Sequence, residues 1–66
     1  MIVLNGEPCD AIAAGATLRA LLDAVGAPER GVAVAVDAEV VPRSEWETFA
    51  VPDGARVEIL TAVQGG

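Results

Sequence analysis

Apolar residues at helical spacing mark a single helix in the first half of the chain. The pattern comprises Leu18, Leu21, Leu22 and Val25. Residues at these intervals share one face of a helix, and that face would pack against the rest of the fold. Thr17 stands at the position of an N-cap, whereas Gly26 and Pro28 favour the end of a helix. The sequence therefore predicts a helix over residues 18–25.

Other stretches are rich in the aliphatic residues that favour β-strands. They cover residues 1–4, 7–12, 32–36, 39–41 and 56–63. Valine alternates with alanine in 32–36, so we expect the valines on the core side of that strand. The last stretch places its core-facing residues at alternate positions, which are Val57, Ile59 and Val63. Leu60 is expected on the opposite face, with Arg56 and Glu58.

Turn-forming residues separate these stretches. Asn5-Gly6 favours the positive φ angles of a type I′ hairpin turn, and Asp37-Ala38 and Pro52-Asp53-Gly54 predict two further turns. Pro8 lacks a backbone N–H, so its strand is expected to begin there or to lie at an edge of the sheet. Ser44 to Glu47 predicts one helical turn, which Ser44 caps and in which Trp46 points inward.

The order of predicted elements indicates the fold class. It reads strand, hairpin strand, helix, strand, short strand, helical turn, strand, and one main helix can cover only one face of a sheet. This order favours an α+β roll in which the first and last strands lie centrally and pair in parallel. A chain of 66 residues makes one domain, residues 1–66, and the ubiquitin-like β-grasp is the expected fold.

The composition excludes several kinds of chemistry. The chain has no His, Lys or Tyr, so it lacks His-containing triads, imidazole metal ligands and Schiff-base lysines. A net charge of −6 opposes binding to nucleic acid and to anionic membranes. The single cysteine, Cys9, cannot form an internal disulfide, and the start of the chain does not resemble a signal peptide. We therefore expect a cytoplasmic protein.

Several single residues admit a functional and a structural interpretation. Cys9 could relay sulfur, but without a basic neighbour it is expected to act as a small buried hydrophobe. Trp46 is expected in the core rather than as an interface anchor. Arg43 fits either a partner contact or a solvated surface position. The acids Asp37, Glu39, Glu45 and Glu47 lack the spacing of a calcium loop and are expected to be solvated, so no metal site is predicted.

The chain ends in Gln64-Gly65-Gly66, which offers no apolar group to bury. Terminal residues often fray, and we predict that residues 63–66 form a flexible tail. Glycines without a Cβ also suit an arm that threads a narrow channel and presents its carboxylate to the active site of another protein. Four such residues reach at most about 13 Å. The terminal carboxylate is therefore the candidate functional group.

Five stretches over the whole chain carry a family resemblance. They are residues 5–8, 30–36, 40–46, 53–59 and 62–66. Together they resemble the ThiS sulfur carriers of thiamin thiazole biosynthesis, and the block from Val41 to Trp46 with the Gly-Gly ending is the most specific part. One departure is Asp37-Ala38, where family members often have Asn-Gly.

The resemblance implies a β-grasp protein that is a co-substrate and not an enzyme, with no catalytic residues and no bound cofactor of its own. An E1-like, ThiF-like adenylyltransferase would use ATP and Mg²⁺ to adenylate the carboxylate of Gly66. Sulfur from a donor such as a cysteine desulfurase would then displace AMP, and the thiocarboxylate would deliver sulfur to a ThiG-like thiazole synthase. Gly65 and Gln64 would form the tail that enters the partner's active site.

Three other functions fit the same features. A molybdopterin synthase small subunit resembles this chain in fold and ending, but the Val41 to Trp46 block and the short chain favour the thiamin carrier. A ubiquitin-like protein modifier is a second alternative, although a chain without Lys could not form lysine-linked chains on itself. An interaction domain with inert terminal glycines is the third. Deletion of Gly65 and Gly66 would separate this last case from the others.

Overall fold

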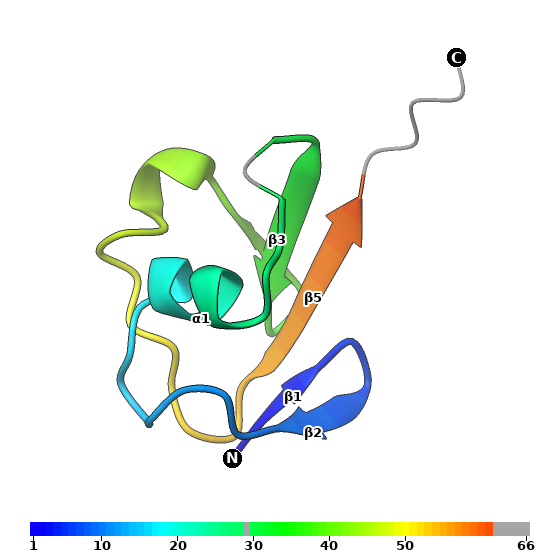
Figure 1. Ribbon diagram of the computed structural model, residues 1–66. Coiled ribbons are helices and arrows are strands. Elements are labelled where there is room, and N and C mark those ends of the chain that lie inside the picture. Colours follow the sequence, from blue (N-terminus) through cyan, green and yellow to red (C-terminus); the bar gives the residue numbers. More distant parts are fainter. Residues whose placement is uncertain (29, 62–66) are drawn as a thin grey trace.

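The structure, a computed structural model, describes residues 1–28 and 30–61 and shows one mixed sheet with a helix packed on one side (Figure 1). The elements are β1 (Ile2–Leu4), β2 (Glu7–Cys9), α1 (Leu18–Ala24), β3 (Val32–Val36), β4 (Glu39–Val41), the 3-10 helix η1 (Arg43–Glu45) and β5 (Arg56–Thr61). Neither α1 nor η1 has the length and apolar run needed to cross a membrane, and the described residues form no other helix.

The first and last strands are neighbours inside the sheet, as the element order predicted. The strand order is β2-β1-β5-β3-β4. β1 and β5 are parallel, with Val3 opposite Arg56 and Leu4 opposite Val57. The other pairs of strands are antiparallel. This topology confirms the α+β roll, and it places β5 between β1 and β3 at the centre of the sheet.

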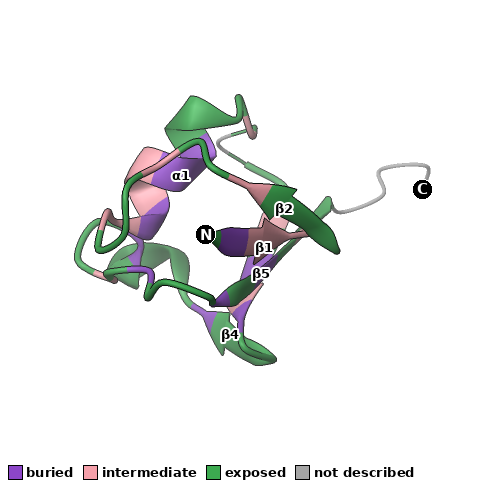
Figure 2. Cartoon of the chain, turned by 90° about the horizontal axis from the view of Figure 1, so that it is seen from below, coloured by how far each residue is buried: buried purple, intermediate pink, exposed green. Residues whose placement is uncertain are grey.

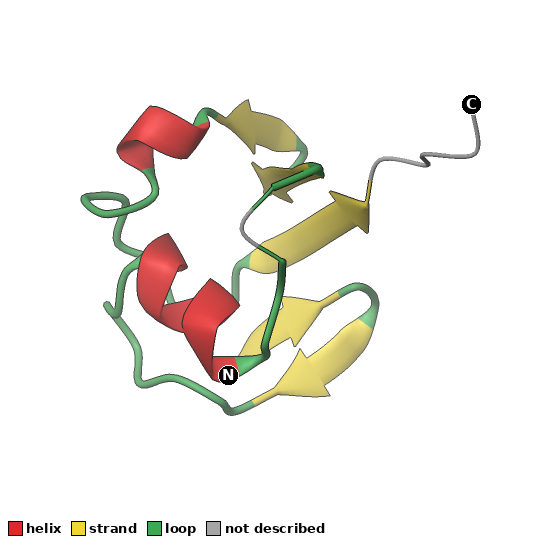
Figure 3. Cartoon of the chain, turned by 45° about the horizontal axis from the view of Figure 1, so that its top comes forward, coloured by secondary structure: helices red, strands yellow, loops and turns green. Residues whose placement is uncertain are grey.

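The core lies between α1 and the inner face of the sheet (Figures 2 and 3). Its fully or almost fully buried side chains are Ile2, Leu18, Leu21, Leu22, Val34, Val36, Val41, Trp46, Val51, Ala55 and Val57. Val34 and Val57 come from adjacent strands and face the helix, as the alternating pattern predicted. The described residues bury no polar or charged side chain, so apolar packing fills this interior.

Helix α1 begins as expected and ends earlier than expected. The Thr17 hydroxyl accepts a hydrogen bond of 3.1 Å from the Ala20 N–H, which confirms the N-cap. Leu18, Leu21 and Leu22 are buried, but Val25 is exposed and caps the C-terminal end. The expectation that Val25 completes the apolar face was therefore wrong. Helix α1 thus ends one residue before the predicted end, and Gly26, at a positive φ of 72°, turns the chain out of the helix as expected.

Trp46 fills the core beside the short helix η1. Its indole N–H donates a hydrogen bond of 3.0 Å to the Val41 carbonyl, so the one polar atom of this buried ring has a partner. The guanidinium groups of Arg19 and Arg43 lie 5.6 and 6.0 Å from the ring centroid. Ser44 lies inside η1 and makes no capping bond, so its predicted capping role was wrong.

Two-residue turns join both hairpins. Asn5 and Gly6 have φ angles of 50° and 84°, in agreement with the predicted type I′ turn. Asp37 and Ala38 have φ angles of 51° and 71°, so this turn keeps the left-handed conformation although neither residue is glycine. Strand β2 ends at Cys9 and not at residue 12, and Pro8 lies in this edge strand as expected.

We predict that Leu22→Asp unfolds the domain. Leu22 is 2% exposed, and its loss removes about 2–3 kcal/mol of apolar burial while a carboxylate would enter the core. A core of this size supplies only about 3–5 kcal/mol of net stability. Circular dichroism melting tests this, with Ala24→Asp at an exposed position of the same helix as the control. A melting curve for Leu22→Asp that matched the parent protein would contradict the assignment of the core.

We also predict that Ala38→Gly stabilises the protein by about 1 kcal/mol, because glycine tolerates the φ of 71° that strains alanine. The gain should raise the melting temperature by about 4–8 °C for a domain of this size. Ala35→Gly, in the extended strand β3, is the matched control and should lower the melting temperature. An unchanged or lower value for Ala38→Gly would show that the turn is not strained.

Candidate functional site at the end of β5

The candidate residues Gln64, Gly65 and Gly66 lie outside the described residues, as does Val63, which was predicted to face the core. The tail predicted for residues 63–66 therefore stays a prediction. The structure shows the strand that leads to them: β5 is described from Arg56 to Thr61, and its last residue pairs with Val32. In the sequence, the candidate residues thus come shortly after the central strand of the sheet.

Strand β5 has a neighbouring strand on both sides over its first residues and on the β3 side over its whole described length. On one side it pairs with β3 along all five residues of that strand, from Val32 to Val36. On the other side, Val3 N–H donates to the Ala55 carbonyl at 2.9 Å and Asn5 N–H donates to the Val57 carbonyl at 2.8 Å. Thr61, the last described residue of β5, is therefore fixed to the sheet through its pairing with β3.

Two side chains extend this backbone pairing, and sequence reasoning missed both. The Asn5 side-chain oxygen accepts a hydrogen bond of 2.9 Å from the Ile59 N–H, where β1 has already turned away. The Asp37 carboxylate accepts a bond of 3.0 Å from the Arg56 N–H. Both residues occupy type I′ turns beside β5, and Asn and Asp at turn positions commonly bond to nearby backbone groups. That preference was the available signal.

The outer face of the sheet carries exposed aliphatic side chains close to the end of β5. Leu60 is 63% exposed and Val40 is 73% exposed. Leu60 lies opposite Ala33, and Val40 lies opposite Ala35, so these four residues form an apolar strip across β5, β3 and β4. Neither helix of the described residues covers this face (Figure 3). Leu60, at the β5 end of this strip, can therefore contact a partner that binds beside Thr61, whereas Val40 lies on the outer edge strand of the sheet.

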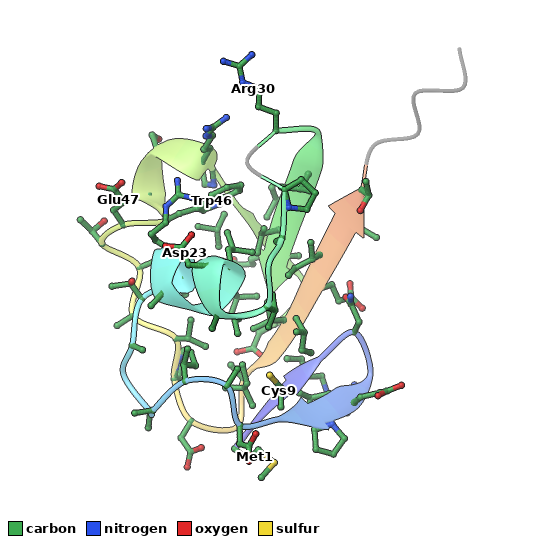
Figure 4. The ribbon with its side chains drawn as sticks, in the orientation of Figure 1. Met1, Cys9, Asp23, Arg30, Trp46 and Glu47 are labelled. Carbon is green, nitrogen blue, oxygen red and sulfur yellow. The ribbon has the colours of Figure 1, made fainter. Side chains whose placement is uncertain are left out.

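Cys9 and the ion pair of the N-terminal ammonium lie at the other end of the sheet from Thr61. Cys9 is half-buried and packs against the core next to Ile2, two strands away from β5, and Figure 4 shows it at the lower end of the sheet. The Met1 ammonium forms an ion pair with Asp53 near the start of β5 and holds the pKa of that carboxyl below its usual value through a hydrogen bond and its charge. Neither Cys9 nor the Met1–Asp53 pair lies near Thr61, where the described part of β5 ends (Figure 4).

Charged groups near Trp46 form a separate surface. Arg19 lies 4.0 Å from the carboxylates of both Asp23 and Glu47 (Figure 4). For Arg43 the sequence allowed two interpretations, a partner contact or a solvated surface position. Its side chain is exposed and lies over the Trp46 ring. The described residues contain no group of three or more Cys, Asp or Glu arranged to hold a metal ion. This finding includes the acids Asp37, Glu39, Glu45 and Glu47.

Comparison with known proteins identifies the family. The ThiS family model matches residues 2–66. The sulfur carrier protein ThiS of Escherichia coli is 30% identical over 66 residues, the full length of both chains. The crystal structure of the thiamine biosynthesis protein ThiS from Geobacter metallireducens superposes with a TM-score of 0.80 at 29% identity, covering 98% of this chain and 97% of that one.

A larger relative contains a similar segment. A thiazole synthase from Paramagnetospirillum magneticum is 40% identical over 65 residues, which is 98% of this chain. The chain spans only 20% of the length of that protein. The structural match confirms the ubiquitin-like β-grasp fold. With the family match over almost the whole sequence, the chain belongs to the ThiS family of sulfur carrier proteins.

Proposed function

We propose that this protein carries sulfur for the formation of the thiamin thiazole ring, as a thiocarboxylate on Gly66. The observation that carries this proposal is the full-length similarity to a ThiS sulfur carrier, combined with a Gly-Gly ending that follows the central strand of the fold in the sequence. Of the functions considered from the sequence, the comparisons support this one, because the family and the structural relative are both ThiS.

The chemistry requires activation of the terminal carboxyl. An α-carboxyl with a pKa of about 3.5 is ionised at neutral pH and is a poor acyl donor. Its oxygen would attack the α-phosphorus of ATP and release pyrophosphate, which leaves an acyl adenylate. A sulfur nucleophile would then attack the Gly66 carbonyl carbon and expel AMP. The new C–S bond replaces the C–O bond to AMP. With sulfide as the nucleophile the product is the thiocarboxylate, whereas a persulfide donor first gives an acyl disulfide, whose S–S bond a thiol then reduces to release the thiocarboxylate.

The enzymes that act on the terminus would supply the rest of the chemistry. We assign adenylation to an E1-like, ThiF-like adenylyltransferase that uses ATP and Mg²⁺, and the sulfur to a donor such as a cysteine desulfurase. This chain would bind no cofactor and would serve as a co-substrate without catalysis of its own. Gly65 and Gln64 would pass through the active-site channel, because glycine beside the reacting carbon leaves room for the approaching groups.

A thiazole synthase is the proposed acceptor of the sulfur. In the relative from Paramagnetospirillum magneticum, a segment similar to this chain belongs to a protein that bears the name thiazole synthase. A carrier that is part of the same polypeptide as a synthase has a high effective concentration at its active site. This relationship supports delivery by the present chain to a ThiG-like partner, which we place in the cytoplasm.

The proposal predicts a defined change in the mass of the protein. After incubation with the matching adenylyltransferase, ATP and a sulfur source, intact mass spectrometry should show the gain that replaces one oxygen atom by sulfur. Fragmentation should place this gain on Gly66. The variant without Gly65 and Gly66 is the control and should remain unchanged.

An unmodified parent protein would contradict the proposal, provided that the adenylyltransferase releases pyrophosphate with another carrier in the same preparation. A mass gain in the control variant would show that the sulfur resides elsewhere, with Cys9 the first position to examine. Transfer of the sulfur to a thiazole synthase, followed as return of the carrier to its original mass, tests the second half of the proposal.

A further inference from the structure

Among the described residues, one short stretch of backbone in the middle of the sheet has no neighbouring strand on one side. β1 ends at Leu4 and turns away at Asn5, whereas β5 continues to Thr61. Figure 1 shows the last part of β5 rising beyond the β1–β2 hairpin, with β3 on its other side only. We call the side of residues 59–61 that faces away from β3 the free edge.

The hydrogen bonds fix which groups point to the free edge. The Val57 carbonyl and the Ile59 N–H both bond to Asn5, on the β1 side of β5. Backbone groups of a strand alternate in direction, so the groups of Glu58 and Leu60 point to β3. The Ile59 carbonyl and the Thr61 N–H therefore point to the β1 side, beyond the reach of the hairpin.

The free edge lacks the features that protect the two outer edges of the sheet. β2 carries Glu7 and Pro8, and β4 begins with Glu39 and is followed by Pro42. Charges and prolines at edges prevent pairing with other chains. Leu60 and Thr61, by contrast, are uncharged, exposed and compatible with strand pairing. Within the described part of the sheet, the edge open to pairing thus lies at the end of β5, a few residues before Gly65 and Gly66 in the sequence.

We propose that an extended segment of the thiazole synthase pairs with the free edge, through hydrogen bonds to the Ile59 carbonyl and the Thr61 N–H. This inference rests on the proposed function. It is an instance of strand addition, in which main-chain bonds provide affinity and alternate side chains provide contacts. The exposed side chain of Leu60 would supply the first apolar contact on the outer face of the sheet.

The length of the terminus favours an occupant from the enzyme that receives it. Five residues follow Thr61, and they extend at most about 17 Å. The active site that binds Gly66 must therefore lie within this distance of Thr61, and the enzyme must cover the end of β5. A strand of the enzyme at the free edge would continue the sheet and direct the terminus toward the active site.

Amide hydrogen exchange tests the pairing in the unmodified protein. In the complex with the thiazole synthase of the same organism, NMR should show exchange of the Thr61 N–H slowed by at least about tenfold. The Val40 N–H is the control. The backbone groups of Ala35 point toward Glu58 on β5, so those of Val40, which lies opposite Ala35 on the other side, point away from β3. The Val40 N–H therefore faces the outer edge of the sheet. Its exchange rate should not change.

A pair of variants tests the contribution to binding. Thr61→Pro removes the N–H at the free edge without loss of a bond to β3, and it should weaken binding of the synthase by about tenfold. Thr61→Val keeps the N–H and the branched side chain, and should bind within about twofold of the parent. Isothermal titration calorimetry of the variants and the parent protein, all without bound sulfur, gives both affinities.

The outcomes separate this inference from the proposed function. Unchanged exchange at Thr61 in the complex, or equal affinity of Thr61→Pro and the parent, would overturn strand addition. The sulfur-for-oxygen mass gain of the parent, measured independently, would still support the carrier function in that case. Slowed exchange of the Thr61 N–H, together with binding that is weakened by Thr61→Pro and not by Thr61→Val, would support the pairing.

Discussion

The fold depends on parallel pairing between the two ends of the chain. Val3 lies opposite Arg56 and Leu4 opposite Val57, so more than fifty residues must close into one loop before this contact forms. Closure of such a loop costs on the order of 3 kcal/mol in chain entropy. The segment between these strands offsets the cost by supplying α1, β3 and the buried Trp46, which together form the core. Parallel pairing also orients β5, because a strand parallel to β1 must run away from the N-terminus, so that Thr61 lies at the far end of the sheet.

With this orientation, the residues of β5 that stabilise the fold differ from those that a partner protein can reach. The inner face of β5 contributes Val57 to the core, and the side chains of Asn5 and Asp37 bond to its backbone from the two flanking turns. The strand is therefore anchored where the fold needs it. Its last residues keep one neighbour, β3, and expose Leu60 on the outer face. Partner proteins can thus engage the end of β5 without disturbing the packing between α1 and the sheet.

Much of this fold could be predicted from the sequence, because the apolar pattern is regular. The helix, the strand positions, the turns and the burial of Trp46 followed from periodicity and turn chemistry. The errors share a cause: Val25 and Ser44 lie where an element ends or begins, and tertiary packing decides such boundaries within one or two residues. The bonds from Asn5 and Asp37 to β5 join residues 54 and 19 positions apart, which local patterns cannot show. Gly65 and Gly66 stay a prediction from the end of the sequence and the family resemblance, since no geometry of the described residues identifies a terminal carboxylate.

A carrier of this size has a physical reason to place its chemistry at the terminus. Enzymes shift the reactivity of side chains by burying them beside charges, and such sites require space inside the fold. Here the described interior contains no polar or charged side chain, and the aliphatic residues are needed to hold 66 residues together. A terminal carboxylate needs no such environment, because activation by ATP supplies its reactivity. The protein then has to provide only a rigid strand, an accessible end and a surface that the correct enzymes recognise.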